Sequence, residues 1–135
     1  MFWLSHHPAE ELDRCYRLGG VHVCARCLGT YPVMFAAIAL QLKLRFPLEH
    51  PLDFIAVIAL TLPATIDWAI GRFRPHRFSN PWRTATGVLL GLALGRTVFI
   101  HLQHPFPPVF LAQGIVVTVV ALPVILASYR RKPRR

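Results

Sequence analysis

Cysteine and histidine side chains are concentrated at the N-terminal end of this 135-residue chain. All three cysteines (Cys15, Cys24 and Cys27) and three of the seven histidines lie within the first 27 residues. Thiolate and imidazole groups at this density are typical of sites that bind a soft or borderline metal ion or carry out thiol redox chemistry. We therefore expect the function of the protein to reside in this segment.

The spacing of the cysteines favours a tetrahedral zinc site made of three cysteines and one histidine. In the Cys-x-x-Cys motif at residues 24–27, two sulfurs reach one ion at about 2.3 Å, while Cys15 and a histidine complete the coordination. We predict His6 as the histidine ligand, with His7 and His22 as alternatives. Two other interpretations remain open: a redox-active dithiol, and ordinary reduced cysteines in a packed cap.

The rest of the chain is strongly apolar, which indicates a membrane protein. Only 16% of the residues are charged, whereas soluble domains carry about 25%, and the mean hydropathy is +0.45. Four apolar stretches are each near the roughly 20 residues that a helix needs to cross about 30 Å of hydrocarbon. They cover residues 28–46, 52–70, 84–102 and 106–129. The sequence thus predicts an all-α integral membrane protein with four transmembrane helices and a short N-terminal Cys/His-rich metal-binding cap.

This pattern divides the chain into three parts. Residues 1–27 are the predicted Cys/His-rich cap, residues 28–129 the four-helix bundle, and residues 130–135 a polybasic tail. Within the cap, Gly19-Gly20 is a point at which the chain can double back. A soluble four-helix bundle is the alternative, and it is disfavoured because no polar face recurs at helical spacing.

The distribution of basic residues predicts the orientation in the membrane. The net charge is +9, and twelve of the fifteen Lys and Arg residues lie in the N-terminal segment, the second connection and the tail. With four crossings these three regions share one side, while the first connection carries Lys43 and Arg45. Since cytoplasmic loops are enriched in Lys and Arg, both termini and the cysteines are predicted to be cytoplasmic. A reducing compartment and an odd number of cysteines disfavour the redox-active dithiol.

The basic tail also predicts a lipid partner. Residues 130–135 follow directly after an apolar stretch, so we expect them to contact anionic headgroups of the bilayer. In a soluble protein the same charge would indicate nucleic-acid binding. Membrane topology already accounts for the charge, and nucleic acid is not an expected partner.

Three glycines form a stripe in the third apolar stretch. Gly87, Gly91 and Gly95 make an unbroken G-x-x-x-G-x-x-x-G pattern on one helix face. Such a stripe lets another helix approach backbone to backbone. The partner helix lies either within this bundle or in a second copy of the chain, so a homo-oligomer is one expectation.

Several polar groups lie at the predicted cytoplasmic end of the helices. Asp67 follows a dozen uncharged residues, and a carboxylate at that depth usually marks a partner or a site. The alternative is that Asp67 lies near the end of its helix and merely pairs with an arginine. Arg83 lies one helical turn before Gly87, and we expect it close to Asp67 and Arg26 if the first three helices cluster.

The motifs together resemble a known family. Cys-Ala-Arg-Cys-Leu-Gly-Thr-Tyr at residues 24–31, preceded by Ser-His-His and Arg-Cys-Tyr, is similar to the core of small bacterial membrane proteins grouped as a domain of unknown function, DUF2085. That family shows C-A-R-C-x-G-x-Y, a later P-x-x-x-D (here Pro63 and Asp67), and an S-N…R…G run (here residues 79–87). Ser5 stands where many relatives have cysteine, so four cysteine ligands cannot be assembled.

The resemblance covers roughly residues 5–95 and implies a multi-pass protein of the bacterial inner membrane. It also implies that a set of spaced residues belongs to one constellation, and that the Tyr31 hydroxyl, one turn after Cys27, faces the same cytoplasmic pocket. The members of the set are Cys24, Arg26, Cys27, Gly29, Tyr31, Asp67, Asn80, Arg83 and Gly87.

Three functions are compatible with these features. The leading hypothesis is a zinc-binding inner-membrane protein that acts as a structural or assembly subunit of a membrane complex, because no complete catalytic set is visible. The first alternative is a membrane-embedded enzyme that uses the metal or the thiols on a lipid or a quinone, with Arg26, Arg83 and Asp67 at an anionic headgroup. The second alternative is a metal or ion transporter, favoured by Asp67.

Overall fold

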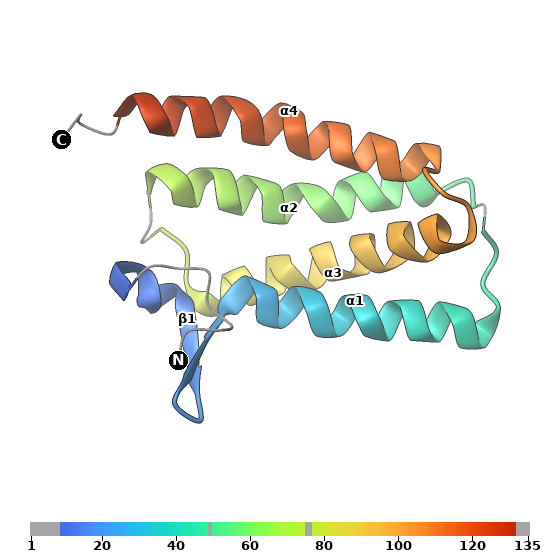
Figure 1. Ribbon diagram of the computed structural model, residues 1–135, viewed down its shortest axis with the longest axis horizontal. Helices are drawn as coiled ribbons and strands as arrows, with labels where there is room; N and C mark the ends of the chain where they lie inside the picture. Colours follow the sequence, from blue (N-terminus) through green and yellow to red (C-terminus); the bar gives the residue numbers. More distant parts are fainter. Residues whose placement is uncertain (1–8, 49, 75–76, 132–135) are drawn as a thin grey trace.

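The computed structural model describes residues 9–48, 50–74 and 77–131. A short 3-10 helix and a two-stranded antiparallel sheet precede four long helices (Figure 1). In chain order the elements are η1 (Ala9–Arg14), β1 (Cys15–Leu18), β2 (Val21–Cys24), α1 (Ala25–Leu44), α2 (Asp53–Phe73), α3 (Asn80–Gln103) and α4 (Pro108–Arg131).

The four helices confirm the predicted membrane architecture. Each is long and apolar enough, by length and composition, to cross a membrane. The N-terminal segment adds a β-hairpin that the all-α prediction did not include. Helix α1 begins at Ala25, directly after β2, and so starts three residues before the predicted Leu28. Arg26 and Cys27 therefore belong to the first spanning helix and not to the cap.

The hairpin forms because two glycines close it. Gly19 has φ +55° and Gly20 has φ +85°, and the two-residue turns that match strand twist require positive φ at both positions. The register pairs Leu18 with Val21 next to the turn and Cys15 with Cys24 at the base. The predicted chain reversal at Gly19-Gly20 is thus confirmed.

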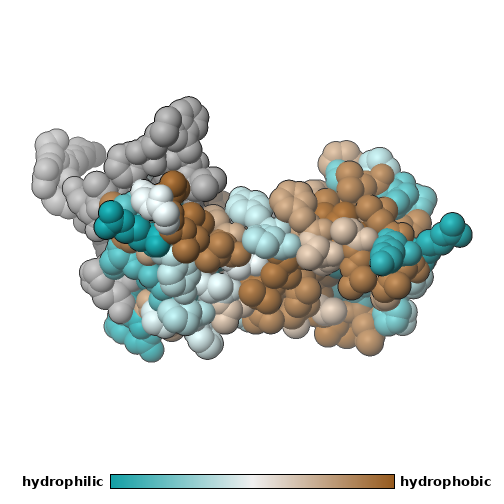
Figure 2. Space-filling view, turned by 90° about the horizontal axis from the view of Figure 1, so that it is seen from below, coloured by the Kyte–Doolittle hydropathy of each residue, from teal (hydrophilic) through white to brown (hydrophobic). Residues whose placement is uncertain are grey.

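The four helices run antiparallel in chain order (Figure 1). The hairpin, the α2–α3 connection and the C-terminal end of α4 lie at the same end of the bundle, which we call the basic end because residues 14–26, 72–83 and 130–131 there carry most of the described arginines. Helix α1 packs chiefly on α3, and α2 lies between α3 and α4. In Figure 2 hydrophobic residues dominate the middle of the visible face, and hydrophilic residues gather toward the two ends.

The glycine stripe lies against α1. A methyl group added at Gly91 would stand 2.5 Å from the carbonyl oxygen of Thr30, and one at Gly95 would stand 2.7 Å from Cβ of Ala37. Gly87 is equally close to the carbonyl oxygen of Arg26. Helix α1 contributes Gly29, whose own added methyl would meet the Thr84 carbonyl oxygen. The two backbones are therefore in contact within one chain.

At the end of the bundle opposite the basic end, an ion pair joins α2 and α3. Arg96 Nη2 lies 2.6 Å from Asp53 Oδ2 and Arg96 Nε lies 2.8 Å from Oδ1, so the guanidinium grips the carboxylate with two bonds. The same side chain donates to Gln41 Oε1 at 3.1 Å and to the Pro47 carbonyl at 2.8 Å. One arginine thus joins α3 to α1, to α2 and to the connection between them.

The orientation predicted from charge has a direct test, because the structure places the α1–α2 connection and the end of α4 at opposite ends. Reporter fusions placed within residues 47–51 and after Arg135 should give opposite signals, with the C-terminal reporter active only in the cytoplasm. A periplasmic signal from the C-terminal fusion would contradict the predicted orientation.

The α1–α3 contact predicts unequal effects for the same substitution at two helical glycines. Gly91→Ala should destabilise the protein by about 1–3 kcal/mol, because the added methyl overpacks a backbone contact. Gly114→Ala is the matched control, since nothing lies within 4 Å of a methyl at that position. Thermal unfolding in detergent measures both changes. Equal unfolding temperatures for the two variants would contradict the close packing.

Candidate functional site

The three thiols meet where the hairpin joins α1. Cys15 and Cys24 are opposite one another in the register, and both are buried, with 8% and 4% of their surfaces exposed. Cys27 is partly buried in the first turn of α1, and its side chain hydrogen-bonds to Cys24. Cys15 is close enough to Cys27 to interact with it electrostatically. The three cysteines therefore lie near the base of the hairpin and interact with one another.

This arrangement does not by itself complete a metal site. Among the described residues, no group of three or more His, Cys, Asp or Glu side chains is placed to hold a metal ion. His6, the predicted histidine ligand, and its alternative His7 lie outside the described residues. His22 lies in β2 opposite Arg17, two residue pairs away from the Cys15–Cys24 pair at the base of the hairpin. Zinc coordination stays a prediction.

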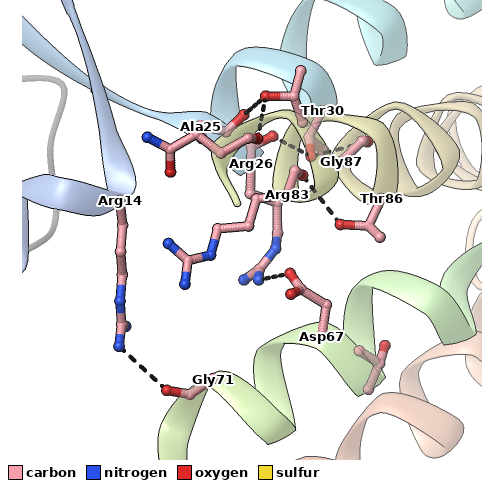
Figure 3. A network of polar contacts seen from close by, with 12 residues as sticks. Arg14, Ala25, Arg26, Thr30, Asp67, Gly71, Arg83, Thr86 and Gly87 are labelled. Carbon is pink, nitrogen blue, oxygen red and sulfur yellow. Dashed lines mark hydrogen bonds and ion pairs between the residues drawn. The ribbon is translucent and has the colours of Figure 1, made fainter. Parts of the chain in front are cut away.

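A cluster of charged side chains lies between the N-terminal ends of α1 and α3 on one side and α2 on the other (Figure 3). We call Arg14, Arg26, Arg83 and Asp67 the arginine cluster. Arg26 Nη2 donates to Asp67 Oδ2 between α1 and α2, and Arg14 Nη2 donates to the Gly71 carbonyl at 3.2 Å. Arg83 is 6% exposed and interacts electrostatically with the other three members and with Asp13. Among the side chains that the structure describes, three guanidiniums thus lie near two carboxylates.

Three atoms of the arginine cluster are buried without a hydrogen-bond partner among the described residues. They are Asp67 Oδ1, on a side chain that is 2% exposed, Arg26 Nε and Arg14 Nε. Buried polar atoms are nearly always paired, and leaving one unpaired costs about 1–3 kcal/mol. One acceptor and two donors of the cluster therefore have no hydrogen bond to a described residue.

Side chains on α3 and α1 hold the cluster in position. The Asn80 amide donates to the Asp13 carbonyl at 2.9 Å and lies 3.4 Å from the Cys15 carbonyl, which attaches the hairpin to the start of α3. Thr84 Oγ1 lies 3.1 Å from the Ala25 carbonyl oxygen, and Thr30 Oγ1 lies 3.1 Å from that of Gly87. These bonds fix the N-terminal ends of α1 and α3 side by side.

A cavity of about 610 Å³ opens next to Arg26. Its walls come from α2, α3 and α4 and are mainly apolar, including Trp68, Leu94 and Phe110. Along α4 the lining runs from Phe110 to Ala121 through Gly114, which is exposed, so the cavity opens on the outer side of the bundle. Arg26 is the charged residue that lines it. The space therefore has a long apolar part and one cationic end.

The predicted polar pocket is thus assembled in part. Arg26, Asp67 and Arg83 meet, and Asn80 acts on the hairpin instead of facing Asp67. Tyr31 is 53% exposed on α1 and is neither in the arginine cluster nor among the described residues that line the cavity.

Sequence reasoning missed Arg14 and the wall contributed by α4. In the sequence, Arg14 is one of the basic residues of the N-terminal segment, and its position directly before Cys15 is the one signal of its role. The residues of the α4 wall give no such signal, because they are ordinary for a membrane helix.

Comparison with protein families shows to which family the chain belongs. A family model of predicted membrane proteins, DUF2085, matches residues 9–97. The chain belongs to this family. No curated protein and no solved structure matches the chain.

The matched region begins at η1 and ends within α3. It contains the three cysteines and the whole arginine cluster. Helix α4, which supplies one wall of the cavity, lies beyond the match. The resemblance seen in the sequence is confirmed for the family, and the family description adds no activity.

Proposed function

We propose that this protein binds a membrane lipid with an anionic headgroup, with the headgroup at the arginine cluster and the acyl part in the adjoining cavity. One observation carries the proposal: an apolar cavity of about 610 Å³ has Arg26 at one end. Ligand sites are typically apolar clefts with a few placed polar groups. An amphiphile with a charged head and a hydrocarbon tail matches this division.

The charge of the site favours a lipid over a quinone. Arg14, Arg26 and Arg83 outnumber Asp67 and Asp13, and guanidinium groups bind phosphate with paired, charge-assisted hydrogen bonds. A neutral quinone brings no charge to Arg26, which lines the cavity. A phosphodiester headgroup brings a negative charge to this guanidinium. The cavity also opens toward the hydrocarbon along α4, where a lipid approaches without leaving the membrane.

The position of the site selects a leaflet. Arg26 is the second residue of α1, so the cationic end of the cavity lies at the basic end of the bundle. With the orientation predicted from charge, the basic end is cytoplasmic, and the ligand is a lipid of the cytoplasmic leaflet. The expectations of an assembly subunit, of catalysis and of transport rest on sequence features alone and stay predictions.

Filling the cavity should weaken lipid binding. Gly114→Phe places a ring in the cavity, because nothing lies within 4 Å of a Cβ added at Gly114. We expect at least about tenfold weaker binding of phosphatidylglycerol, equivalent to about 1.4 kcal/mol. Leu111→Phe is the matched control, because Leu111 is 49% exposed on α4 and outside the lining. Native mass spectrometry of protein released from phosphatidylglycerol nanodiscs measures the bound lipid.

Phosphatidylcholine nanodiscs supply the charge control for the same measurement. Wild-type protein should retain phosphatidylglycerol in preference to phosphatidylcholine of the same acyl composition, because phosphatidylcholine carries no net negative charge. Equal lipid retention by wild type, Gly114→Phe and Leu111→Phe would contradict the proposal.

A zinc-stabilised cap is a second candidate, supported by the facing Cys15–Cys24 pair and by the hydrogen bond between Cys27 and Cys24. One zinc ion held by Cys15, Cys24, Cys27 and His6 would keep the hairpin base closed. Because such a site would be structural, it is compatible with lipid binding and with the role of an assembly subunit.

The zinc candidate predicts one divalent ion per chain, measured by elemental analysis of detergent-purified protein. Cys24→Ser should abolish binding, and His6→Ala should weaken it more than His22→Ala. Binding should also weaken as pH falls, because protons compete for the thiolate and imidazole ligands. Folded protein that holds no metal and has three freely titrating thiols would exclude this candidate.

A further inference from the structure

The carboxylate of Asp67 raises a difficulty for any purely anionic headgroup. It lies inside the arginine cluster, 2% exposed, with Oδ2 engaged by Arg26 and Oδ1 buried without a partner among the described residues. An ionised carboxylate accepts hydrogen bonds and donates none. A phosphate placed beside it gains from the arginines but meets like charge at Asp67. The open oxygen requires a donor.

Arg26 connects this open acceptor to the cavity. The same guanidinium lines the cavity and donates to Asp67, and its Nε is itself buried without a described partner. Asp67 is not among the residues that line the cavity, so a headgroup at the cationic end contacts Arg26, whose Nε is open, and lies one side chain away from the open Asp67 Oδ1. These two atoms call for complementary groups on a single ligand.

The geometry points to a headgroup that combines a phosphodiester with a hydroxyl group, as in phosphatidylglycerol, with Asp67 accepting a hydrogen bond from the hydroxyl. This inference rests on the proposed lipid-binding function and adds what the site selects. Asp67 also disfavours an anionic headgroup that has no hydrogen-bond donor, because such a headgroup would leave the carboxylate unpaired and the two negative charges would repel each other. Asp67 is therefore a specificity-determining residue for the lipid.

The alternative role for Asp67 is purely structural, as the partner that neutralises Arg26. Asp53 provides the comparison, because it also joins two helices through an arginine, at 2.6 Å from Arg96. Both oxygens of Asp53 are engaged by Arg96, whereas Oδ1 of Asp67 is open among the described residues. A structural ion pair has no need of a free acceptor.

Two anionic lipids, one with hydroxyl groups on its headgroup and one without, test the inference. Phosphatidylglycerol and phosphatidylethanol of identical acyl chains both carry one negative charge, and phosphatidylethanol has a headgroup one carbon shorter that lacks the hydroxyls. Full-length wild-type protein in mixed nanodiscs should bind phosphatidylglycerol at least about tenfold more tightly, as measured by native mass spectrometry. Glycerol 3-phosphate is added in a separate arm; competition at millimolar concentration would identify a free phosphoester, not a lipid, as the source of the headgroup.

Two variants separate selection from folding. Asp67→Asn should reduce the preference to about twofold or less while retaining anionic lipid, whereas Asp53→Asn breaks the other ion pair and should leave the tenfold preference unchanged. Equal affinity of the wild-type protein for the two lipids would by itself overturn the inference. If Gly114→Phe still weakens binding in that case, the proposed function survives; if it does not, both fail.

Discussion

The close contact between α1 and α3 is the constraint on which the rest of the structure depends. Gly87, Gly91 and Gly95 present bare backbone to α1, and Gly29 returns the same surface to α3. Within a membrane, helices gain little by burying apolar surface from lipid, so packing at small residues and polar contacts between helices decide which faces meet. Here the glycines bring the N-terminal ends of two spanning helices to within backbone contact.

That contact places Arg26 and Arg83 together. Each lies in the first turns of its helix, and the parallel alignment of the two N-terminal ends at the basic end sets both beside α2 (Figure 3). A third arginine, Arg14, arrives from the hairpin, whose docking depends on Asn80. Asp67 offsets part of the charge. Arg26 also borders the cavity, so the contact between α1 and α3 sets the charge at that end of the cavity.

The two ends of the bundle use the same chemistry differently. At the far end Arg96 and Asp53 satisfy one another completely and fasten a connection. At the basic end Arg26 and Asp67 pair through one carboxylate oxygen, and Arg26 Nε and Asp67 Oδ1 have no hydrogen-bond partner among the described residues. Helix α4 adds an apolar wall and packs mainly on α2, so the cavity remains open on its outer side. The proposed lipid would fill the cavity and bring an anionic group to Arg26.

The sequence by itself determined the four spans, the family and the chain reversal at Gly19-Gly20. Hydropathy, glycine spacing and turn chemistry are local properties, and each of these features follows from a short stretch of chain. Only the tertiary structure decided that the glycines meet α1 inside one chain, that Asn80 holds the hairpin, and that α4 forms a cavity wall. The rotation of each helix about its axis sets these outcomes, and that rotation is fixed by contacts between residues tens of positions apart, which no local pattern encodes.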